Sequence, residues 1–420
     1  MPKIVNLASN IKRQLPAELV GFMQAAGQAA QSRGERLYLV GGVVRDLLLG
    51  RTNLDLDLVV DGNAINLANQ LSRTYQGKIM THPRFGTAKL QWDGWSVDIA
   101  TARSETYARP GALPIVKLGS IKDDLARRDF TINAMAVLLG PDGYGELLDP
   151  FGGRDDLGRK LVRILHQKSF IDDATRIWRG LRYEQRLSFQ LEQNTLRLIE
   201  RDVAMLGTIS GDRIRHELEL ALKEESPEKI IRRADELGVL AKLHPSLKGD
   251  SWLEERFAQA RRLSSPDAPS VKLYMALLAC RLSGEESGQL ISYLRLPKTA
   301  AQTVRDTVSI KSRLELMADP ELAPSRIYSL LYGFSSTAIM ANSLAADSPV
   351  AREHIDLFLN KLRYVKSALT GEALKRMGVP PGPRIKEILN RLREARLDGK
   401  VNSRKDEERL VEEWVMKKKP

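Results

Sequence analysis

The sequence predicts an α+β protein: a small α/β head with a short mixed sheet, followed by an elongated extension that is entirely helical. Short strand-like segments bounded by turn residues occur only in the first 150 residues or so. From about residue 155 onward, apolar residues recur at the three-to-four spacing of amphipathic helices. A chain of 420 residues has room for two to four domains, each with its own core.

The elements of the head are predicted from local pattern and from turn residues. Helical spacing over 16–33 stops at Gly34, and a second helix follows Asn63, whose side chain can cap it. Alternating or short apolar runs between turn residues indicate strands. We expect these strands within 36–40, 55–60, 77–82, 86–92 and 95–100.

The second half of the head is less regular. Residues 103–120 are rich in Pro and Gly and should form a long loop, and long loops in compact domains are often functional. Residues 127–139 return to helical character, and 140–153 should form a hairpin turn followed by a loop.

Charge and cysteine content limit the class of protein. The net charge of +12 favours an anionic partner such as nucleic acid, with a merely basic protein as an equal alternative. Cys280 is the only cysteine, which excludes a disulfide framework and a cysteine zinc site and fits a reducing cytoplasm. The first 20 residues lack the apolar core of a signal peptide, and no window reaches the roughly 20 apolar residues of a membrane span. We therefore expect a cytoplasmic protein without a membrane partner.

Two aspartates interrupt a segment that otherwise resembles a buried strand. Asp55 and Asp57 should share one face, because residues i and i+2 of a strand do, and they should repel each other unless a cation lies between them. Mg²⁺ is commonly held by one or two carboxylates plus substrate phosphates. Asp98 offers a third carboxylate on a neighbouring strand, which suggests a two-metal site for phosphoryl displacement. Taken alone, the two aspartates are more often a solvated strand end.

A glycine pair precedes these acids. Gly41 and Gly42 follow a strand and open a helix that begins near Val43, so free backbone N–H groups could cradle a phosphate. Arg45 and Asp46 lie in the first turn of that helix, close to where a triphosphate would lie. The pattern lacks the G-K-[ST] of a Walker loop and the G-x-G-x-x-G of a dinucleotide site.

Together these residues form a family signature. The segment "GGVVRDLLLGRTNLDLDLVV" closely resembles the first motif of the class II tRNA nucleotidyltransferase and poly(A) polymerase family, whose members include enzymes that add CCA, or part of it, to tRNA without a template. The resemblance is strong over about 36–225, recognisable over 369–413 and weak between them. Five further segments resemble the later motifs of this family in the same order: 124–137, 149–165, 172–189, 210–222 and the tail segment 369–401.

The resemblance implies a domain plan and a reaction. The tRNA 3′-hydroxyl would attack the α-phosphate of ATP or CTP in line and release pyrophosphate, with Mg²⁺ bound in a two-metal site. The implied parts are a nucleotidyltransferase head (1–148), a helical neck with the base-binding segment (149–225), a helical body (226–345) and a helical tail that binds tRNA (346–420).

The resemblance also assigns roles to residues. Asp55 and Asp57 would hold the metals, and Asp98 would help to activate the primer hydroxyl. Arg127 is expected to lie in solvent at the start of a helix and to have no binding role. The residues implied to bind the sugar and phosphates of the nucleotide are Gly41, Gly42, Arg45, Arg128, Asp129 and Asn133. Arg179 and Arg182 follow Arg176 on the same helix face at steps of three and could bind the triphosphate; the alternative for Arg182 is an exposed basic stripe.

The incoming base would be read by Asp173 and Arg176, which lie three residues apart and should share one helix face. A carboxylate and a guanidinium together present acceptors and donors, as the edge of a base does. The chain departs from the family motif at Asp172, usually Glu, and at Ala174, usually Pro. Tyr183 fits core packing better than base stacking.

These departures, with Pro110, Gly111 and Pro114 in the long loop, resemble members that add only A or only CC. A companion enzyme would then complete the CCA end of the same tRNA. Two alternatives stay open: a poly(A) polymerase acting on other RNA 3′ ends, and a non-catalytic tRNA-binding protein.

The tail offers one candidate RNA contact. Arg384 and Lys386 open a helix after a Gly-Pro turn, where they could contact tRNA phosphates. The alternative is a simple turn between two helices.

Overall fold

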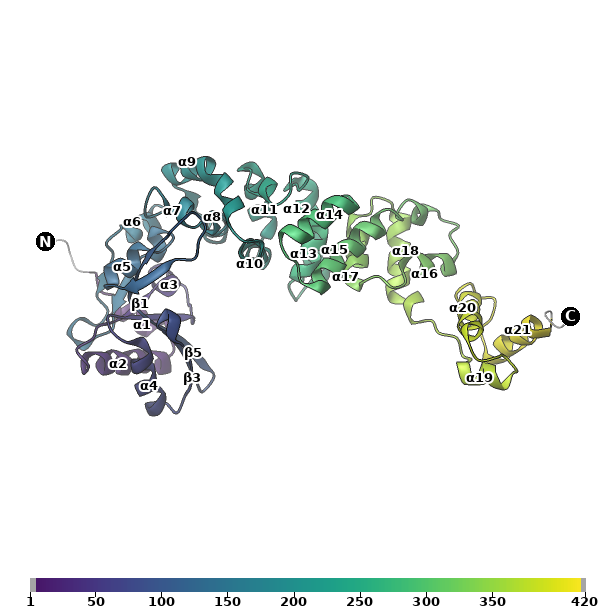
Figure 1. Ribbon diagram of the computed structural model, residues 1–420, viewed down its shortest axis with the longest axis horizontal. Helices are drawn as coiled ribbons and strands as arrows, with labels where there is room; N and C mark the ends of the chain where they lie inside the picture. Colours follow the sequence, from purple (N-terminus) through teal and green to yellow (C-terminus); the bar gives the residue numbers. More distant parts are fainter. Residues whose placement is uncertain (1–4, 417–420) are drawn as a thin grey trace. The chain divides into compact units, whose positions relative to one another are not determined.

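A computed structural model describes residues 5–416 of the chain. The chain forms two compact units, Met1–Lys242 and Leu243–Pro420 (Figure 1). The predicted fold class is confirmed, since all the strands of the described residues lie in the first unit and the second is helical. The predicted boundaries at 148, 225 and 345 stay predictions; the first unit holds the expected head and neck and the start of the expected body.

A mixed sheet of seven strands forms the centre of the first unit, in the order β3-β4-β5-β2-β1-β8-β9. Its β2 and β5 run parallel, and its other neighbouring strands run antiparallel. The strands are β1 (Leu37–Val40), β2 (Leu56–Val60), β3 (Lys78–His82), β4 (Thr87–Trp92), β5 (Trp95–Thr101), β8 (Ala136–Leu138) and β9 (Leu147–Leu148).

Helices α2 (Ala17–Gln31) and α4 (Ala64–Thr74) pack on one face of this sheet. Phe22 of α2 stacks on Trp92 of β4 with their ring centroids 4.3 Å apart. The Asn63 side chain accepts a hydrogen bond from the Asn66 N–H and caps α4, as predicted. The opposite face is covered beside β1 and β8 by α5 (Ile121–Ala126), whose Ile121 and Leu125 join the core there.

Two predictions for the head are wrong. Residues 103–120 form a hairpin of β6 (Arg103–Thr106) and β7 (Ile115–Leu118), so only its tip is a loop. Residues 127–139 contain the 3₁₀ turn η2 (Thr131–Asn133) and strand β8 in place of a helix. Ala136 pairs with Val40 in the sheet, and this long-range pairing outweighs the helix propensity of the local Ala, Met and Leu residues.

Helices complete the first unit. Helix α8 (Thr175–Leu187) is amphipathic, with Ile177, Trp178 and Leu181 fully buried on its apolar side. Its polar side is thereby left for the site described below. The other elements are α1 (Ala8–Gln14), α3 (Gly42–Leu48), η1 (Pro83–Phe85), η3 (Pro141–Gly143), α6 (Gly153–Gly158), β10 (Leu161–Val162), α7 (Ser169–Asp172), β11 (Gln190–Leu191), α9 (Gln193–Asp202), η4 (Val203–Thr208), α10 (Gly211–Leu222), α11 (Pro227–Glu236) and η5 (Leu240–Lys242).

The second unit is a succession of helices, and two of its apolar clusters lie in its later part. One cluster includes Ile327, Leu331 and Ile355, and the other includes Leu374, Leu392 and Val411 of the tail. The helices are α12 (Ser251–Ser264), α13 (Val271–Ala279), α14 (Gly284–Tyr293), α15 (Lys298–Lys311), η6 (Leu316–Ala318), α16 (Pro324–Leu331), α17 (Ser336–Ala345), α18 (Pro349–Asn360), η7 (Leu362–Tyr364), α19 (Gly371–Arg376), α20 (Pro383–Leu397) and α21 (Arg404–Met416).

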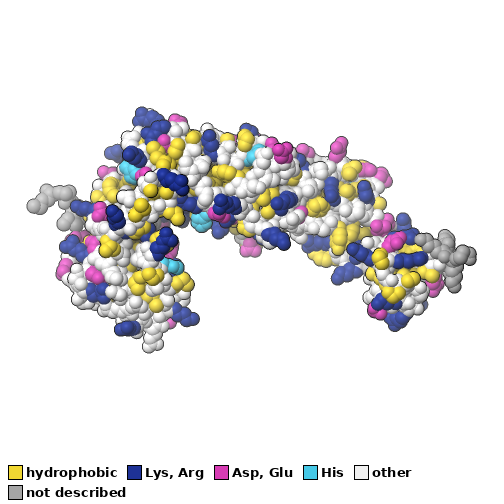
Figure 2. All heavy atoms as spheres, viewed as in Figure 1, with side chains coloured by type: hydrophobic (Ala, Val, Ile, Leu, Met, Phe, Trp, Pro, Cys, Tyr) yellow, Lys and Arg dark blue, Asp and Glu magenta, His cyan; other side chains and the backbone are white. Residues whose placement is uncertain are grey.

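Lys and Arg side chains are distributed along the visible face of both units (Figure 2). No helix within residues 5–416 has the length and apolar character needed to cross a membrane.

Candidate active site

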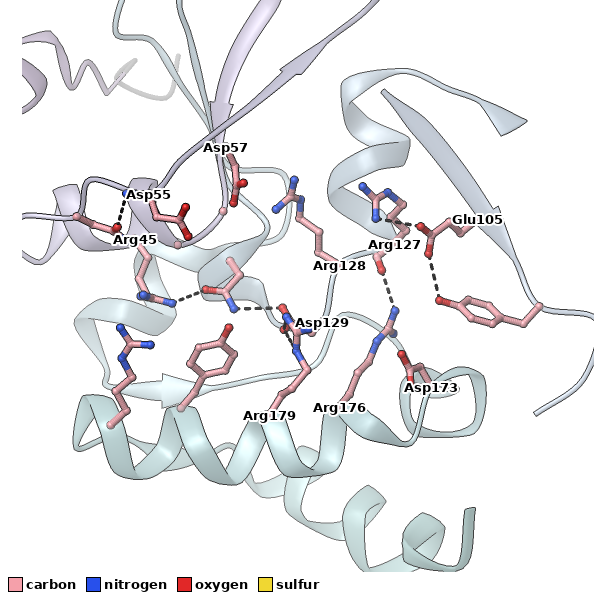
Figure 3. A pocket seen from close by; sticks show the side chains of 17 residues that line it. Arg45, Asp55, Asp57, Glu105, Arg127, Arg128, Asp129, Asp173, Arg176 and Arg179 are labelled. Carbon is pink, nitrogen blue, oxygen red and sulfur yellow. Dashed lines mark hydrogen bonds and ion pairs between the residues drawn. The ribbon is translucent and has the colours of Figure 1, made fainter. Parts of the chain in front are cut away.

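A cavity of about 550 Å³ lies in the first unit between the end of β2, helix α8 and the hairpin β6–β7. In Figure 3, Asp55 and Asp57 lie at one end of it, and Glu105 and Asp173 lie at the other. Its volume is within the range of small-molecule sites. Besides Asp55 and Asp57, nine of the predicted nucleotide-binding residues line it: Gly41, Gly42, Arg45, Arg128, Asp129, Asn133, Asp173, Arg176 and Arg179.

The glycine turn adopts a backbone that the site requires. Gly41 has a φ of 80°, and helix α3 begins at Gly42, close to the predicted start. A Cβ at Gly41 would lie 3.0 Å from Nη1 of Arg128 and 3.6 Å from Oδ2 of Asp57. A side chain at this position would therefore be strained and would crowd the acidic end of the cavity.

The three predicted catalytic aspartates lie in or beside β2 and β5. Asp57 stands directly opposite Asp98 in the parallel pairing of these strands, so both project from the same face of the sheet. Asp55 lies one residue before β2, which corrects its predicted place inside a strand.

Asp57 is in a setting that suits a bound cation. Burial, followed by repulsion from Asp55, raises the pKa of Asp57 to about 6, although Arg128 opposes the shift. Within the described residues, no three side chains of His, Cys, Asp or Glu converge as a metal site. Asp98 does not line the cavity; its Oδ2 lies 2.7 Å from Nζ of Lys89. That hydrogen bond is the main cause of a raised pKa for Lys89.

A buried hydrogen-bonded chain connects α3, η2 and α8. Nη1 of Arg45 donates to Oδ1 of Asn133 at 2.8 Å, and the Asn133 amide donates to Oδ1 of Asp129 at 3.1 Å. Arg179 then donates to Oδ2 of Asp129 at 2.6–2.8 Å. Although burial favours the neutral acid, Arg179 and these hydrogen bonds lower the pKa of Asp129, and Asp129 raises that of Arg179. This series of hydrogen bonds thus holds Arg179, which lines the cavity, in one position.

Arg45 and Arg128 are also fixed by carboxylates. Arg45 is 3% exposed and donates through Nε and Nη2 to the carboxylate of its neighbour Asp46. Arg128 donates to Oδ2 of the fully buried Asp124, four residues earlier. Both guanidinium groups are therefore positioned before any nucleotide arrives.

The predicted base-reading pair, Asp173 and Arg176, lies at the other end of the cavity. Asp173 is in extended backbone between α7 and α8, so the prediction that it shares a helix face with Arg176 is wrong. Its Oδ1 accepts from the N–H and hydroxyl of Thr175, which makes it a cap of α8. Its Oδ2 accepts from Arg213 of α10 at 2.8 Å.

Arg176 is held equally firmly. It is 5% exposed and donates to the Ser169 hydroxyl and to the Arg127 carbonyl, both at 2.8 Å. The Arg127 side chain, in turn, donates to Glu105 of the hairpin at 3.1 Å. Arg127 is thus a structural link in the cavity wall, and the expectation of a solvated helix start is wrong.

In the second half of α8, the residues that face the cavity are not the ones predicted. Arg182 does not line the cavity; it lies 3.8 Å from Glu217 and 3.9 Å from Glu224. Tyr183 lines the cavity instead, so the expectation that Tyr183 serves only core packing does not describe its position. The missed lining residues are Asn53, Glu105, Tyr107, Arg127, Tyr183 and Arg186.

Two of these missed residues, Tyr183 and Arg186, could have been predicted from the sequence. They continue the helical spacing of Arg176 and Arg179, at positions 176, 179, 183 and 186. The hairpin residues Glu105 and Tyr107 carried no such signal. Burial raises the pKa of Tyr107 to about 12, and its hydroxyl donates to Glu105 at 3.2 Å.

In the second unit, Arg384 and Lys386 lie in the first turn of α20, as predicted. Gly382 precedes this helix with a φ of 134°, and Pro383 is its first residue. Lys386 is exposed and Arg384 is half-buried.

Two family models match this chain. The model described as "Poly A polymerase head domain" matches residues 37–163, and "Probable RNA and SrmB- binding site of polymerase A" matches residues 188–250.

Three curated relatives span most of the chain. An A-adding tRNA nucleotidyltransferase of Halalkalibacterium halodurans is 32% identical over 99% of this chain and 97% of its own length. Another, of Geobacter sulfurreducens, is 35% identical over 96% of this chain, which spans only 48% of that relative. A CC-adding tRNA nucleotidyltransferase of Deinococcus radiodurans is 33% identical over 89% of this chain and 88% of its own length.

Solved structures agree with these relatives. A CCA-adding enzyme of Thermotoga maritima complexed with tRNA matches with a TM-score of 0.80 at 31% identity, covering 99% of this chain and 100% of that one. A complex of a CCA-adding enzyme with ATP matches with a TM-score of 0.84 at 32% identity and the same coverage. The chain belongs to the tRNA nucleotidyltransferase and poly(A) polymerase family of enzymes.

Proposed function

We propose that this enzyme transfers AMP from ATP to the 3′ end of a tRNA that already ends in CC. One observation carries the proposal: each of the two base-reading residues, Asp173 and Arg176, is held by two protein partners. A reader held in one arrangement suits an enzyme that selects one base. The names of the two A-adding relatives support adenine as that base. Addition of CC alone, supported by the Deinococcus relative, is the second candidate.

The reaction is an in-line attack of the tRNA 3′-hydroxyl on the α-phosphate, which breaks the α–β bond and releases pyrophosphate. Asp98 accepts the proton of the attacking hydroxyl. Arg128 and Arg179 bind phosphate oxygens, for which a guanidinium fork is suited. Because both are fixed in advance, they stabilise the developing charge without reorganising.

Asp55 and Asp57 fit Mg²⁺. Two oxygen donors stand together, and burial and repulsion from Asp55 raise the pKa of Asp57, so a bound cation would stabilise its charged form. With only two protein carboxylates at this point, the nucleotide phosphates would complete the ligand set of the expected two-metal site. The bound ions would supply charge stabilisation at the reacting phosphate.

Two partners complete the proposal. The tRNA phosphates are contacted by Arg384 and Lys386 in the tail. Because the tRNA must already carry CC, a companion CC-adding enzyme has to act first. The cytoplasmic location stays a prediction; Cys280 is a buried free thiol, compatible with a reducing compartment.

The deciding experiment offers tRNAs that end at the discriminator base, at C or at CC, each with CTP or ATP alone. We expect incorporation only from ATP on the tRNA ending in CC, with one nucleotide added. CTP incorporation on the shorter tRNAs would overturn A-addition, and long A tails would identify a poly(A) polymerase.

A variant separates catalysis from binding. Asp55→Ala should abolish Mg²⁺-dependent incorporation while leaving the Kd for tRNA within about twofold, because Asp55 lies at the metal end of the cavity. Retained activity would contradict the metal assignment. Asp93→Asn, in the exposed turn between β4 and β5, is the control and should behave as the wild type, because Asn tolerates the φ of 44° at this position.

A further inference from the structure

The sheet face that carries the catalytic aspartates continues past them onto two more strands. Asp98 of β5 stands opposite Lys89 of β4, and Lys89 stands opposite Met80 of β3. Residues that are directly opposite across a sheet point to the same face. One row of side chains therefore runs from Asp57 out to Met80.

This outer part of the sheet face is open. Met80 is 60% exposed, and the side chains of Lys89 and Asp98 are 40% and 44% exposed. The alternate residues of β4 and β5, such as Leu90 and Val97, are buried on the face that α2 and α4 cover. We call this area the open sheet face and define it by Lys78, Met80, His82, Thr87, Lys89, Gln91 and Ser96.

The chemistry of the open sheet face suits an RNA strand. It carries two lysines and a histidine, and none of the residues that define it is acidic. Lysines make sequence-independent contacts with nucleic-acid phosphates. The polarisable side chain of Met80 can pack against a base. The area is continuous with Asp98, which would act on an RNA hydroxyl.

The direction of the reaction points to the same area. The nucleotide cavity lies on the β1 side of Asp57, where Gly41 and Arg128 stand. In an in-line displacement, the attacking oxygen and the leaving pyrophosphate are on opposite sides of the reacting phosphorus. With the triphosphate on the β1 side, the hydroxyl has to arrive from the β5 side.

We propose that the open sheet face receives the last nucleotides of the RNA primer and that Lys89 exchanges its ion pair with Asp98 for a primer phosphate. In the free enzyme, Lys89 holds the Asp98 carboxylate in place across the two strands. When the primer binds, Lys89 turns to the RNA and Asp98 is freed to face the 3′-hydroxyl. This inference rests on the proposed nucleotidyl transfer, because it takes the position of the triphosphate from it.

The test compares the binding of two RNAs, so it does not depend on turnover. The Kd is measured for a tRNA ending in CC and for the same tRNA without those two nucleotides. The double variant Lys78→Met/Lys89→Met should bind the longer tRNA about tenfold more weakly than the wild type and the shorter one equally well. The matched control is Lys12→Met/Lys122→Met, which removes two exposed lysines of α1 and α5. Equal loss on both RNAs, or loss on neither, would overturn the inference.

Cross-linking provides a second, independent measurement on the unaltered protein. A tRNA carrying 4-thiouridine as its penultimate nucleotide should cross-link to peptides that contain Met80 or Lys89. Cross-links confined to α8 or α10 would overturn the inference. If the cross-link forms but no nucleotide is ever added, the proposed function fails and the RNA contact stands.

Discussion

Arg213 of α10 donates a hydrogen bond to Asp173 of the proposed base-reading pair, with 2.8 Å between Nη2 and Oδ2. The other carboxylate oxygen of Asp173 is held by Thr175. The orientation of this carboxylate is therefore set by two elements that are far apart in sequence. Arg213 does not line the cavity, so it acts as a positioning residue.

We expect Arg213→Ala to reduce the selectivity for ATP over CTP. Without Arg213, Asp173 keeps its cap of α8 but loses the charged partner that aims its second oxygen. A hydrogen bond to a charged group is worth about 1.5–3 kcal/mol when buried and less here, where Arg213 is 31% exposed. The ratio of kcat/KM for ATP to that for CTP should fall about tenfold.

Arg215→Ala is the control for this prediction. Arg215 lies on the same helix and pairs with Asp212 at 3.0 Å and with Glu219 at 3.6 Å, away from Asp173. Its removal should leave the ATP-to-CTP ratio unchanged. If Arg213→Ala slows both nucleotides by the same factor, Arg213 supports the fold and has no part in base selection.

The proposed base-reading site shows what the sequence could and could not predict. Asp173 and Arg176 were identified from a local motif, and both line the cavity. The prediction that they share a helix face is wrong, because Asp173 lies before α8 and caps this helix. The pairing of Arg213 with Asp173 could not be predicted from the sequence, because the two residues are 40 positions apart and meet only when α10 packs against α8.

Asp57 makes the folded state sensitive to pH when no cation is bound. Its pKa is about 6 in the folded protein, against about 3.9 in an unfolded chain. The folded state thus binds this proton more tightly, and the free energy of unfolding falls as the pH rises from about 4 to about 6. Asp57→Asn removes that loss. We expect the variant to be about 1–2 kcal/mol more stable at pH 8 and no more stable at pH 4, allowing for solvent screening.

Urea unfolding in EDTA at the two pH values, followed by circular dichroism, measures this difference. Asp93→Asn, in the exposed β4–β5 turn, should change stability by less than about 0.5 kcal/mol at both pH values. Added Mg²⁺ should stabilise the wild type and not the Asp57→Asn variant. A loss of stability at pH 8 on replacing Asp57 would contradict the burial of an unneutralised charge.

The register of α8 shows a second limit of sequence patterns. Repeated steps of three predicted Arg182 in the cavity, but a helix of 3.6 residues per turn drifts from such a series. Tyr183 and Arg186 take that place, and Arg182 pairs with Glu217 and Glu224. Those acids are distant in sequence, so only the packed structure decides which arginine faces the nucleotide.

The contact of the tail with tRNA can be tested by charge reversal. Arg384→Glu/Lys386→Glu changes two basic residues in the first turn of α20. We expect the Kd for tRNA to rise about tenfold or more at low salt, because each residue gives up a phosphate contact. The slope of log Kd against log salt, between about 50 and 200 mM, should fall by about two. The affinity for ATP should not change, since both residues lie in the second unit and the nucleotide cavity lies in the first.

The matched control reverses two basic residues in the first turn of the neighbouring tail helix. Arg404→Glu/Lys405→Glu makes the same change in net charge at exposed positions of α21. If the turn at Gly382 places Arg384 and Lys386 against the RNA backbone, only their reversal reduces the salt slope by about two. If both double variants weaken binding equally with the same slope, the tail attracts RNA through its overall charge, and the turn before α20 is only a connection between two helices.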